Sequence, residues 1–302
     1  MKTRIVFMAL FFAGSLSLAA EKTQTSMDNS KVMSEIRGTF GMVPTFMKEF
    51  PPEALPGAWE EFKTIQLSPN TALEPKIKEV IALAVASQIP CRYCVYFHKK
   101  TATFNGAKAS ELKEAIAIAA STRKWSAYFY GSQQDMASFK ADVDKMVTSM
   151  KNPPKGKEPV TVTDASSAFK DMENTMGFVP NFIKAYPEAG IAGAWNELKG
   201  LEMNPNTALN AKTKDLVSLA VSSQVPCQYC TYLDTEFAKA DGATAQEIKE
   251  AVAMAGLVRH WSTVLNGLRQ EDKAFEREVD QIIKHLERGK NLAPKKVSYK
   301  EE

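Results

Sequence analysis

The sequence lacks the features that define several large protein classes. Its four cysteines are too few for a small fold held together by disulfides. Its 38 Lys and Arg almost balance its 35 Asp and Glu, and the net charge of +3 predicts binding neither to nucleic acid nor to an acidic membrane. No glycine-rich nucleotide motif is present, so NAD and flavin are not expected as cofactors. What remains is an ordinary globular composition over 302 residues, enough for about two domains.

Long apolar runs are also lacking, except at the start of the chain. Lys2 and Arg4 precede an apolar run from Ile5 to Leu18, and small residues follow it. This pattern predicts a secretory signal peptide over residues 1–20. An uncleaved anchor is the alternative, but the run is shorter than the ~20 residues that span a bilayer. We therefore expect an exported protein, periplasmic in a Gram-negative source, with no stable membrane insertion after cleavage.

The chain is a tandem duplication. Cys91 and Cys94 recur 136 residues later as Cys227 and Cys230. The same offset relates all four tryptophans in pairs, Trp59 with Trp195 and Trp125 with Trp261. These matches predict a tether at residues 21–30, a first unit at 31–152, a Pro- and Lys-rich linker at 153–165, a second unit at 166–288 and a flexible charged tail at 289–302.

Both units are predicted to be helical. Ala, Glu, Lys, Leu and Met are common, and few stretches alternate as strands do. In the first unit we expect helices over residues 75–87 and 91–105, a third from about residue 110, and separate helices holding residues 125–132 and 139–150. Thr244 to Glu247 matches a helical capping box in the second unit. The predicted fold class is all-α, with two similar bundles side by side.

The most informative motif joins four side chains of the first unit. Pro90 precedes a predicted helix, which places Cys91 near its N-cap and Cys94 about one turn further on. Free N–H groups and the positive end of the helix dipole lie there and stabilise a thiolate. His98 follows one turn after Cys94 and can accept or relay a proton, and Glu79 on the preceding helix can orient it. A thiol pair, a base and a carboxylate suit thiol redox chemistry.

Other interpretations of the paired cysteines remain open. Two CxxC motifs can supply a Cys₄ zinc site, but 132 residues separate Cys94 from Cys227, far beyond the spacing of a zinc ribbon. A disulfide within each CxxC can be purely structural, although so small a loop adds little stability. We therefore expect no metal, and favour the redox interpretation.

The motif Glu-x11-Cys-x2-Cys-x3-His resembles the signature of the AhpD-like, carboxymuconolactone decarboxylase-like superfamily of alkylhydroperoxidase type. The resemblance covers about residues 40–145 and 176–281 and implies small all-helical domains. It implies that Cys94 attacks the peroxide and becomes a sulfenic acid, that Cys91 resolves it as a disulfide, and that Glu79 and His98 relay protons. The decarboxylase branch lacks the paired cysteines, so lactone decarboxylation is not expected.

The sequence departs from this signature in two places. Tyr93 stands between the cysteines where the best-known form has His, which removes one relay member. In the second unit Asp215 and Asp234 stand where Glu79 and His98 stand. A nearby carboxylate disfavours a thiolate, so Cys227 and Cys230 are expected to be a slow secondary redox pair, a structural disulfide, or part of a decayed copy kept for packing.

Three functions follow as hypotheses. The first is an exported thiol-dependent peroxidase that takes an organic hydroperoxide or hydrogen peroxide and an unknown thiol electron donor. The second is a protein thiol–disulfide oxidoreductase, although no thioredoxin-like βαβ pattern surrounds the motif. The third is a non-catalytic helical interaction module with oxidised CxxC pairs. The superfamily commonly forms symmetric oligomers, so a homo-oligomer is also expected.

Overall fold

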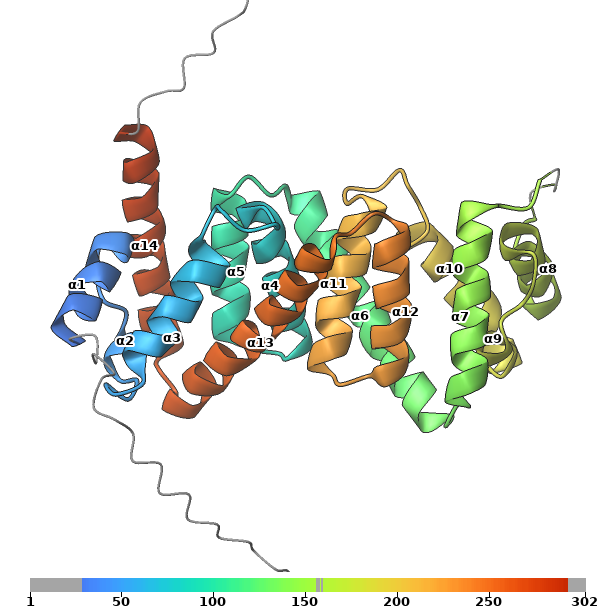
Figure 1. Ribbon diagram of the computed structural model, residues 1–302, viewed down its shortest axis with the longest axis horizontal. Coiled ribbons are helices and arrows are strands. Elements are labelled where there is room, and N and C mark those ends of the chain that lie inside the picture. Colours follow the sequence, from blue (N-terminus) through green and yellow to red (C-terminus); the bar gives the residue numbers. More distant parts are fainter. Residues whose placement is uncertain (1–28, 156–157, 159, 293–302) are drawn as a thin grey trace, which may run out of the picture.

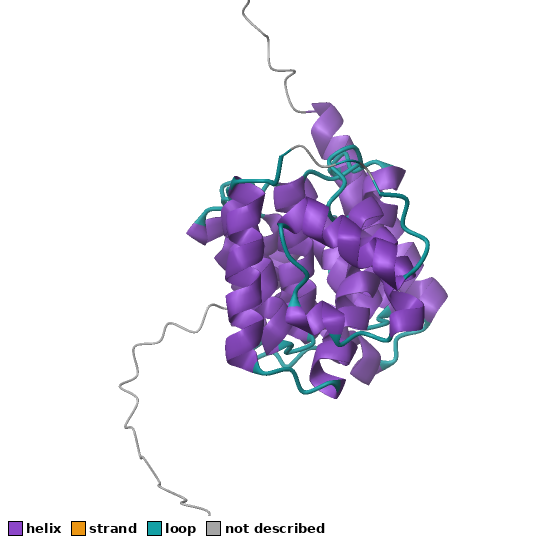
Figure 2. Cartoon of the chain, turned by 90° about the vertical axis from the view of Figure 1, so that its right-hand side faces the viewer, coloured by secondary structure: helices purple, strands orange, loops and turns teal. Residues whose placement is uncertain are grey.

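The computed structural model describes residues 29–155, 158 and 160–292, and every regular element in that part of the chain is a helix (Figure 2). The predicted signal peptide and most of the predicted tether lie outside the described residues. No helix among the described residues is long and apolar enough to cross a membrane. Because every regular element in the described residues is a helix, the all-α prediction is confirmed.

The helices fall into two matching series. The first is α1 (Asn29–Phe40), α2 (Thr45–Lys48), α3 (Leu55–Glu61), the π-helix η1 (Phe62–Leu67), α4 (Pro75–Gln88), α5 (Arg92–Phe104), α6 (Ala109–Gly131) and α7 (Met136–Lys151). The second is α8 (Ala165–Met176), α9 (Asn181–Lys184), α10 (Glu188–Leu201), α11 (Ala211–Gln224), α12 (Gln228–Ala240), α13 (Ala245–Leu268) and α14 (Asp272–Leu292).

Local signals in the sequence place most helix ends correctly. Pro75 opens α4, Cys91 caps α5, and Thr244 forms the expected capping box of α13. Two expectations are wrong. The separate helix expected over residues 125–132 is the end of α6, since neither Pro nor Gly interrupts residues 109–130. Helix α14 continues to Leu292, into the region expected to be a flexible tail.

The two repeats exchange their C-terminal helices. Helix α7 of the first repeat packs against α12, while α14 of the second packs against α5 and α1. Figure 1 shows α14, in red, beside the blue N-terminal helices, and α7, in green, near the yellow α8–α10. Accordingly, Trp125 lies in the core around the second CxxC pair and Trp261 in the core around the first. Each bundle therefore contains helices of both repeats.

Reciprocal hydrogen bonds fasten this exchange. Glu250 on α13 accepts the backbone N–H groups of Ala72 and Leu73 in the first repeat, at 2.9 and 2.7 Å. Its counterpart Glu114 on α6 accepts those of Ala208 and Leu209 in the second, at 2.6 and 3.2 Å. Each carboxylate thus satisfies two backbone N–H groups of the other repeat. The two sets of bonds hold each repeat against the other in the same way.

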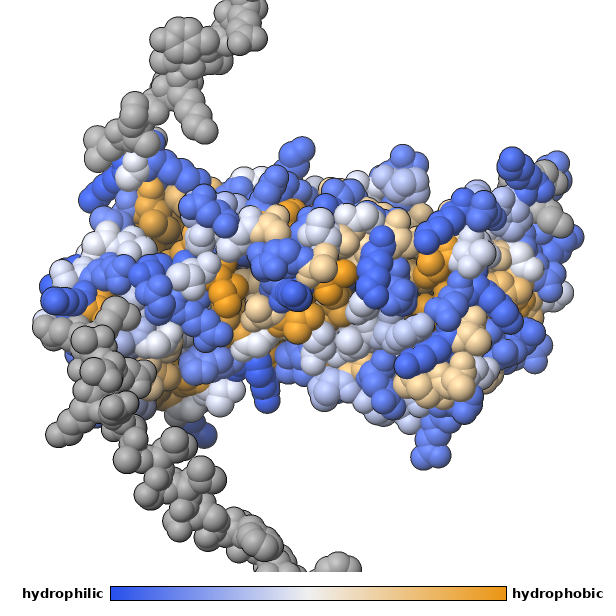
Figure 3. Space-filling model, viewed as in Figure 1, coloured by the Kyte–Doolittle hydropathy of each residue, from blue (hydrophilic) through white to orange (hydrophobic). Residues whose placement is uncertain are grey.

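Apolar surface remains on the outside of the exchanged bundles. Figure 3 shows it along the middle of the visible face, with hydrophilic side chains toward the edges and ends. Ile116 on α6 and its counterpart Val252 on α13 are 41% and 40% exposed. The symmetry of the duplication therefore extends to the surface as well as to the core.

Candidate functional site

The first CxxC pair lies where α5 begins. Cys91 is the N-cap residue, and its sulfur accepts the backbone N–H of Cys94 at 3.3 Å. Both side chains are buried, and the structure records the two residues as a disulfide. The predicted position of these sulfurs at a helix N-terminus is thus what the structure shows, and the dipole of α5 favours negative charge there.

His98 and Glu79 form a buried pair next to this disulfide-bearing turn. Helix α4 turns back after Gln88, so Glu79 on α4 faces His98 on α5, with 2.8 Å between Oε2 and Nδ1. The two side chains are only 3% and 5% exposed. An Nδ1–H that donates to the carboxylate leaves Nε2 free to exchange a proton with another group. The structure therefore brings Glu79 and His98 together, and His98 lies one turn after Cys94 on α5.

Two further side chains complete this carboxylate environment and were missed by sequence reasoning. Thr101 donates its hydroxyl to Glu79 Oε2 at 2.5 Å, and Gln66 donates its amide N–H to Oε1 at 3.0 Å. With His98, three donors satisfy the buried carboxylate and fix its orientation. One signal was available: in the second repeat Thr101 becomes Phe237 and Gln66 becomes Glu202, just where the motif also changes.

A buried lysine positions Gln66. Lys78 on α4 is fully buried and donates to the carbonyl groups of Ile65 and Ser68 and to the hydroxyl of Thr71. Burial lowers its pKa. These bonds hold the end of the π-helix η1, which carries Gln66. Extra-wide helical turns of this kind often occur at functional sites, and here one presents an amide to the relay.

The other repeat holds α5 in place. Tyr93 donates its hydroxyl to the carbonyl of Gln270 at 2.6 Å, and Tyr96 donates to Asp280 at 3.0 Å. Arg92, which could have stood beside a thiolate, forms an exposed ion pair with Asp272 at 2.7 Å. The helix with the cysteines is therefore anchored from its exposed side by the loop before α14 and by α14 itself.

The second CxxC pair has the same backbone setting and different surroundings. Cys227 caps α12, its sulfur accepts the N–H of Cys230 at 3.2 Å, and the two are recorded as a disulfide. Asp234 and Asp215 occupy the positions of His98 and Glu79, as the sequence indicated. The structure adds Glu202 at the position of Gln66.

Burial raises the pKa of each of these carboxyl groups. Burial, a hydrogen bond with Asp241 and the charge of that residue raise the pKa of Asp215 to about 9. Burial raises the pKa of Asp234 well above its usual range, and burial also raises that of Glu202. At neutral pH Asp215 therefore carries a proton and cannot accept one as an imidazole can.

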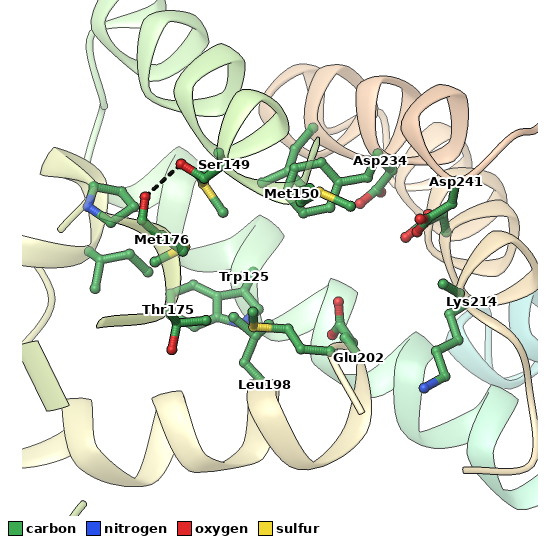
Figure 4. A pocket seen from close by; sticks show the side chains of 18 of the residues that line it. Trp125, Ser149, Met150, Thr175, Met176, Leu198, Glu202, Lys214, Asp234 and Asp241 are labelled. Carbon is green, nitrogen blue, oxygen red and sulfur yellow. Dashed lines mark hydrogen bonds between the residues drawn. The ribbon is translucent and has the colours of Figure 1, made fainter. Parts of the chain in front are cut away.

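A cavity of about 380 Å³ opens beside the second pair. Its walls include Cys230, Asp215 and Asp234 together with many apolar side chains, and it lies between helices of both repeats. Figure 4 shows Trp125, Thr175 and Met176 at one end and Asp234 and Asp241 at the other, with Met150 beside Asp234 and Glu202 across from it. The exchange of helices therefore builds this cavity, because α6 and α7 supply one wall.

No group of three or more His, Cys, Asp or Glu within the described part of the chain has the geometry to hold a metal ion. The Cys₄ zinc interpretation gains no support from the structure, which instead pairs each CxxC within itself.

Comparisons with known proteins agree with the duplication. The model of the carboxymuconolactone decarboxylase family matches residues 53–133 and again residues 189–270, together more than half of the chain. A crystal structure from Burkholderia xenovorans, provisionally assigned as a gamma-carboxymuconolactone decarboxylase subunit, has a similar fold. Its TM-score is 0.50 at 17% identity, over 87% of this chain and 99% of that one.

A curated relative supports the sequence match. An uncharacterized protein from the cox locus of Paracoccus denitrificans is 37% identical over 62 residues, 20% of this chain. The match spans 56% of that relative. Taken with the family match in both halves and the shared helical fold, these findings show that the chain belongs to the carboxymuconolactone decarboxylase family, as a tandem duplication.

Proposed function

We propose that this protein is an exported thiol-dependent peroxidase whose active site is the first CxxC pair. One observation carries the proposal: His98, which is on the same helix as Cys94, is buried and in contact with the carboxylate of Glu79. A proton acceptor at this place, beside sulfurs at a helix N-terminus, is what a peroxide-reducing thiol requires.

The proposed reaction has three balanced steps. The Cys94 thiolate attacks one peroxide oxygen, the O–O bond breaks, and the sulfenic acid of Cys94 forms while the alkoxide leaves as an alcohol with a proton relayed through His98. The Cys91 thiol then attacks the Cys94 sulfur, which forms the disulfide and releases water. A dithiol donor finally reduces the disulfide and is itself oxidised.

The burial of the sulfurs supports a small substrate. Cys91 is fully buried and Cys94 is 3% exposed. A hydroperoxide is small enough to reach such a site after a local opening, whereas a folded protein disulfide is not. This contrast favours a peroxide over an exported protein as the oxidising substrate.

The matched cysteines provide the test. Cys94→Ser is expected to abolish consumption of tert-butyl hydroperoxide with dithiothreitol as donor, while Cys230→Ser keeps most of it. Mass spectrometry after one equivalent of peroxide, with the disulfides first reduced and a Cys91→Ser chain to prevent resolution, should find the sulfenic acid on Cys94. Equal losses in both variants, or no modified sulfur, would contradict the proposal.

A further inference from the structure

The second site has acidic side chains at three positions where the first site has uncharged or basic ones. His98 is matched by Asp234, Gln66 by Glu202 and Asn105 by Asp241, while Glu79 is matched by Asp215. Asp234 is buried, and Glu202 and Asp241 are half-buried. A copy kept only for packing has no need of three additional carboxyl groups at these positions, because carboxyl groups are costly to remove from water. The changes therefore point to a separate use for the second site.

Two of these carboxyl groups, Asp234 and Asp215, each keep one oxygen without a hydrogen-bond partner, and both line the cavity. Asp234 is 6% exposed, its Oδ2 has no hydrogen-bond partner, and it lines the cavity of about 380 Å³. Asp215 Oδ2 also lacks a partner. Figure 4 shows Asp234 on α12 and Asp241 just after the end of α12 reaching into the cavity, with Glu202 on the opposite side. A buried oxygen with no donor, aimed into an empty volume, indicates a ligand that supplies donors.

The nearby lysine does not supply them. Lys214 Nζ donates to the carbonyl groups of Leu201 and Asn204 and lies 3.4 Å from Glu114. In Figure 4 its ammonium group extends away from Asp234 and Asp241. The ammonium group of Lys214 is thus already bound to other acceptors and donates no hydrogen bond to Asp215 or Asp234.

The rest of the cavity wall defines what kind of ligand fits. Its other members are mainly aromatic and aliphatic side chains, among them Trp125, Phe129, Phe182 and Leu198. Aromatic faces attract cations, and an apolar wall takes an apolar body. The volume lies within the range of small-molecule sites, about 300–1,000 Å³. The walls match a molecule that is cationic at one end and apolar at the other.

We propose that the cavity beside Cys230 is a binding site for a small organic ammonium ion with an apolar or aromatic body. Its N–H groups bind the carboxyl oxygens of Asp234, Asp215 and Glu202, and its body lies against Trp125 and Leu198. A bare metal ion fits less well, because no group of acids among the described residues has metal-binding geometry. The proposal is independent of the peroxidase chemistry in the first site.

Binding of this ion is coupled to protons. The raised pKa values of Asp215 and Asp234 mean that the empty site holds protons, which leave when the ammonium supplies a positive charge. The charged groups around it come from four segments: Glu114 and Lys124 of α6, Glu197 of α10 and Glu202 just after it, Lys214 and Asp215 of α11, and Asp234 of α12 with Asp241 just after it. Helix α7 lines the cavity with uncharged side chains.

Calorimetric titration of the full chain with benzylammonium chloride tests the proposal, with benzyl alcohol as the neutral probe of the same shape. We expect the ammonium to bind at least tenfold more tightly than the alcohol and to release about one proton per site at pH 7, measured as a heat that changes with the buffer. Asp234→Asn should weaken ammonium binding at least tenfold. Glu188→Gln, which removes an exposed acid in the first turn of α10 outside the cavity wall, should not.

Three results would overturn it: equal binding of the two probes, no change in Asp234→Asn despite an unchanged fold by circular dichroism, or displacement of the ammonium by millimolar magnesium or calcium. None of these measurements uses peroxide, so their outcome does not depend on whether the first site is a peroxidase.

Discussion

The two CxxC sites share a backbone and differ in the charges around it. In each, a cysteine caps a helix and accepts the N–H of its partner, at 3.3 Å in the first and 3.2 Å in the second. In the first site a histidine and two further hydrogen-bond donors surround one carboxylate. In the second, carboxyl groups with raised pKa values face a cavity. The comparison teaches that the duplicated fold fixes where the sulfurs lie, whereas a few buried side chains decide what chemistry is available beside them.

The largest expected effect comes from placing the second site's residue in the first. His98→Asp puts a carboxyl group beside Glu79 in a buried setting, where one of the two must be protonated. The relay then has no base, and we expect peroxide consumption to fall by roughly 10²-fold or more. Initial rates with tert-butyl hydroperoxide measure this.

His260→Asp is the matched control, because His260 is exposed on α13 and packs only against aromatic rings. Its rate should stay near that of the parent chain. If both variants keep full activity, the difference between the sites does not rest on the imidazole.

A medium effect is expected on stability against pH. The pKa of Asp215 is raised to about 9 in the folded chain. Between about pH 4 and pH 9 the folded chain therefore holds a proton that the unfolded chain has lost, so the free energy of unfolding falls as pH rises through that window. For one carboxyl group the slope is at most about 1.4 kcal/mol per pH unit.

Asp215→Asn should flatten this dependence and raise the melting temperature at about pH 9 relative to the parent chain. Thermal unfolding followed by circular dichroism at several pH values gives the slope. A variant with the same slope as the parent would show that Asp215 is not the proton-binding group.

The smallest expected effect concerns the exchange itself. Tyr93 and Tyr229 donate their hydroxyl groups to Gln270 and Gln134, each in the opposite repeat, at 2.6 and 2.7 Å. Tyr93→Phe and Tyr229→Phe should each reduce the free energy of unfolding by about 1 kcal/mol. Urea denaturation measures both, and a clear inequality would show that one half of the exchange is stronger than the other.

Much of the first site could be predicted from the sequence because its signals are local. Pro90 and the capping cysteine fix the start of α5, and helical spacing fixes His98 one turn beyond Cys94. Glu79 followed from the motif once the chain was known to turn back between the two helices. Gln66 and Thr101 were missed because neither belongs to the motif, and Gln66 reaches Glu79 only through the π-helix held by Lys78.

The sequence by itself determined the duplication, the helical class and the difference in charge between the two sites, since these are written in repeat spacing and residue identity. Only the tertiary structure decided which helices surround which site. Helical periodicity says that a face is apolar but not which apolar face it meets, so α7 and α14 could equally have closed on their own repeats. The carboxylates of Glu114 and Glu250 favour the exchanged arrangement, because each binds backbone N–H groups of the other repeat.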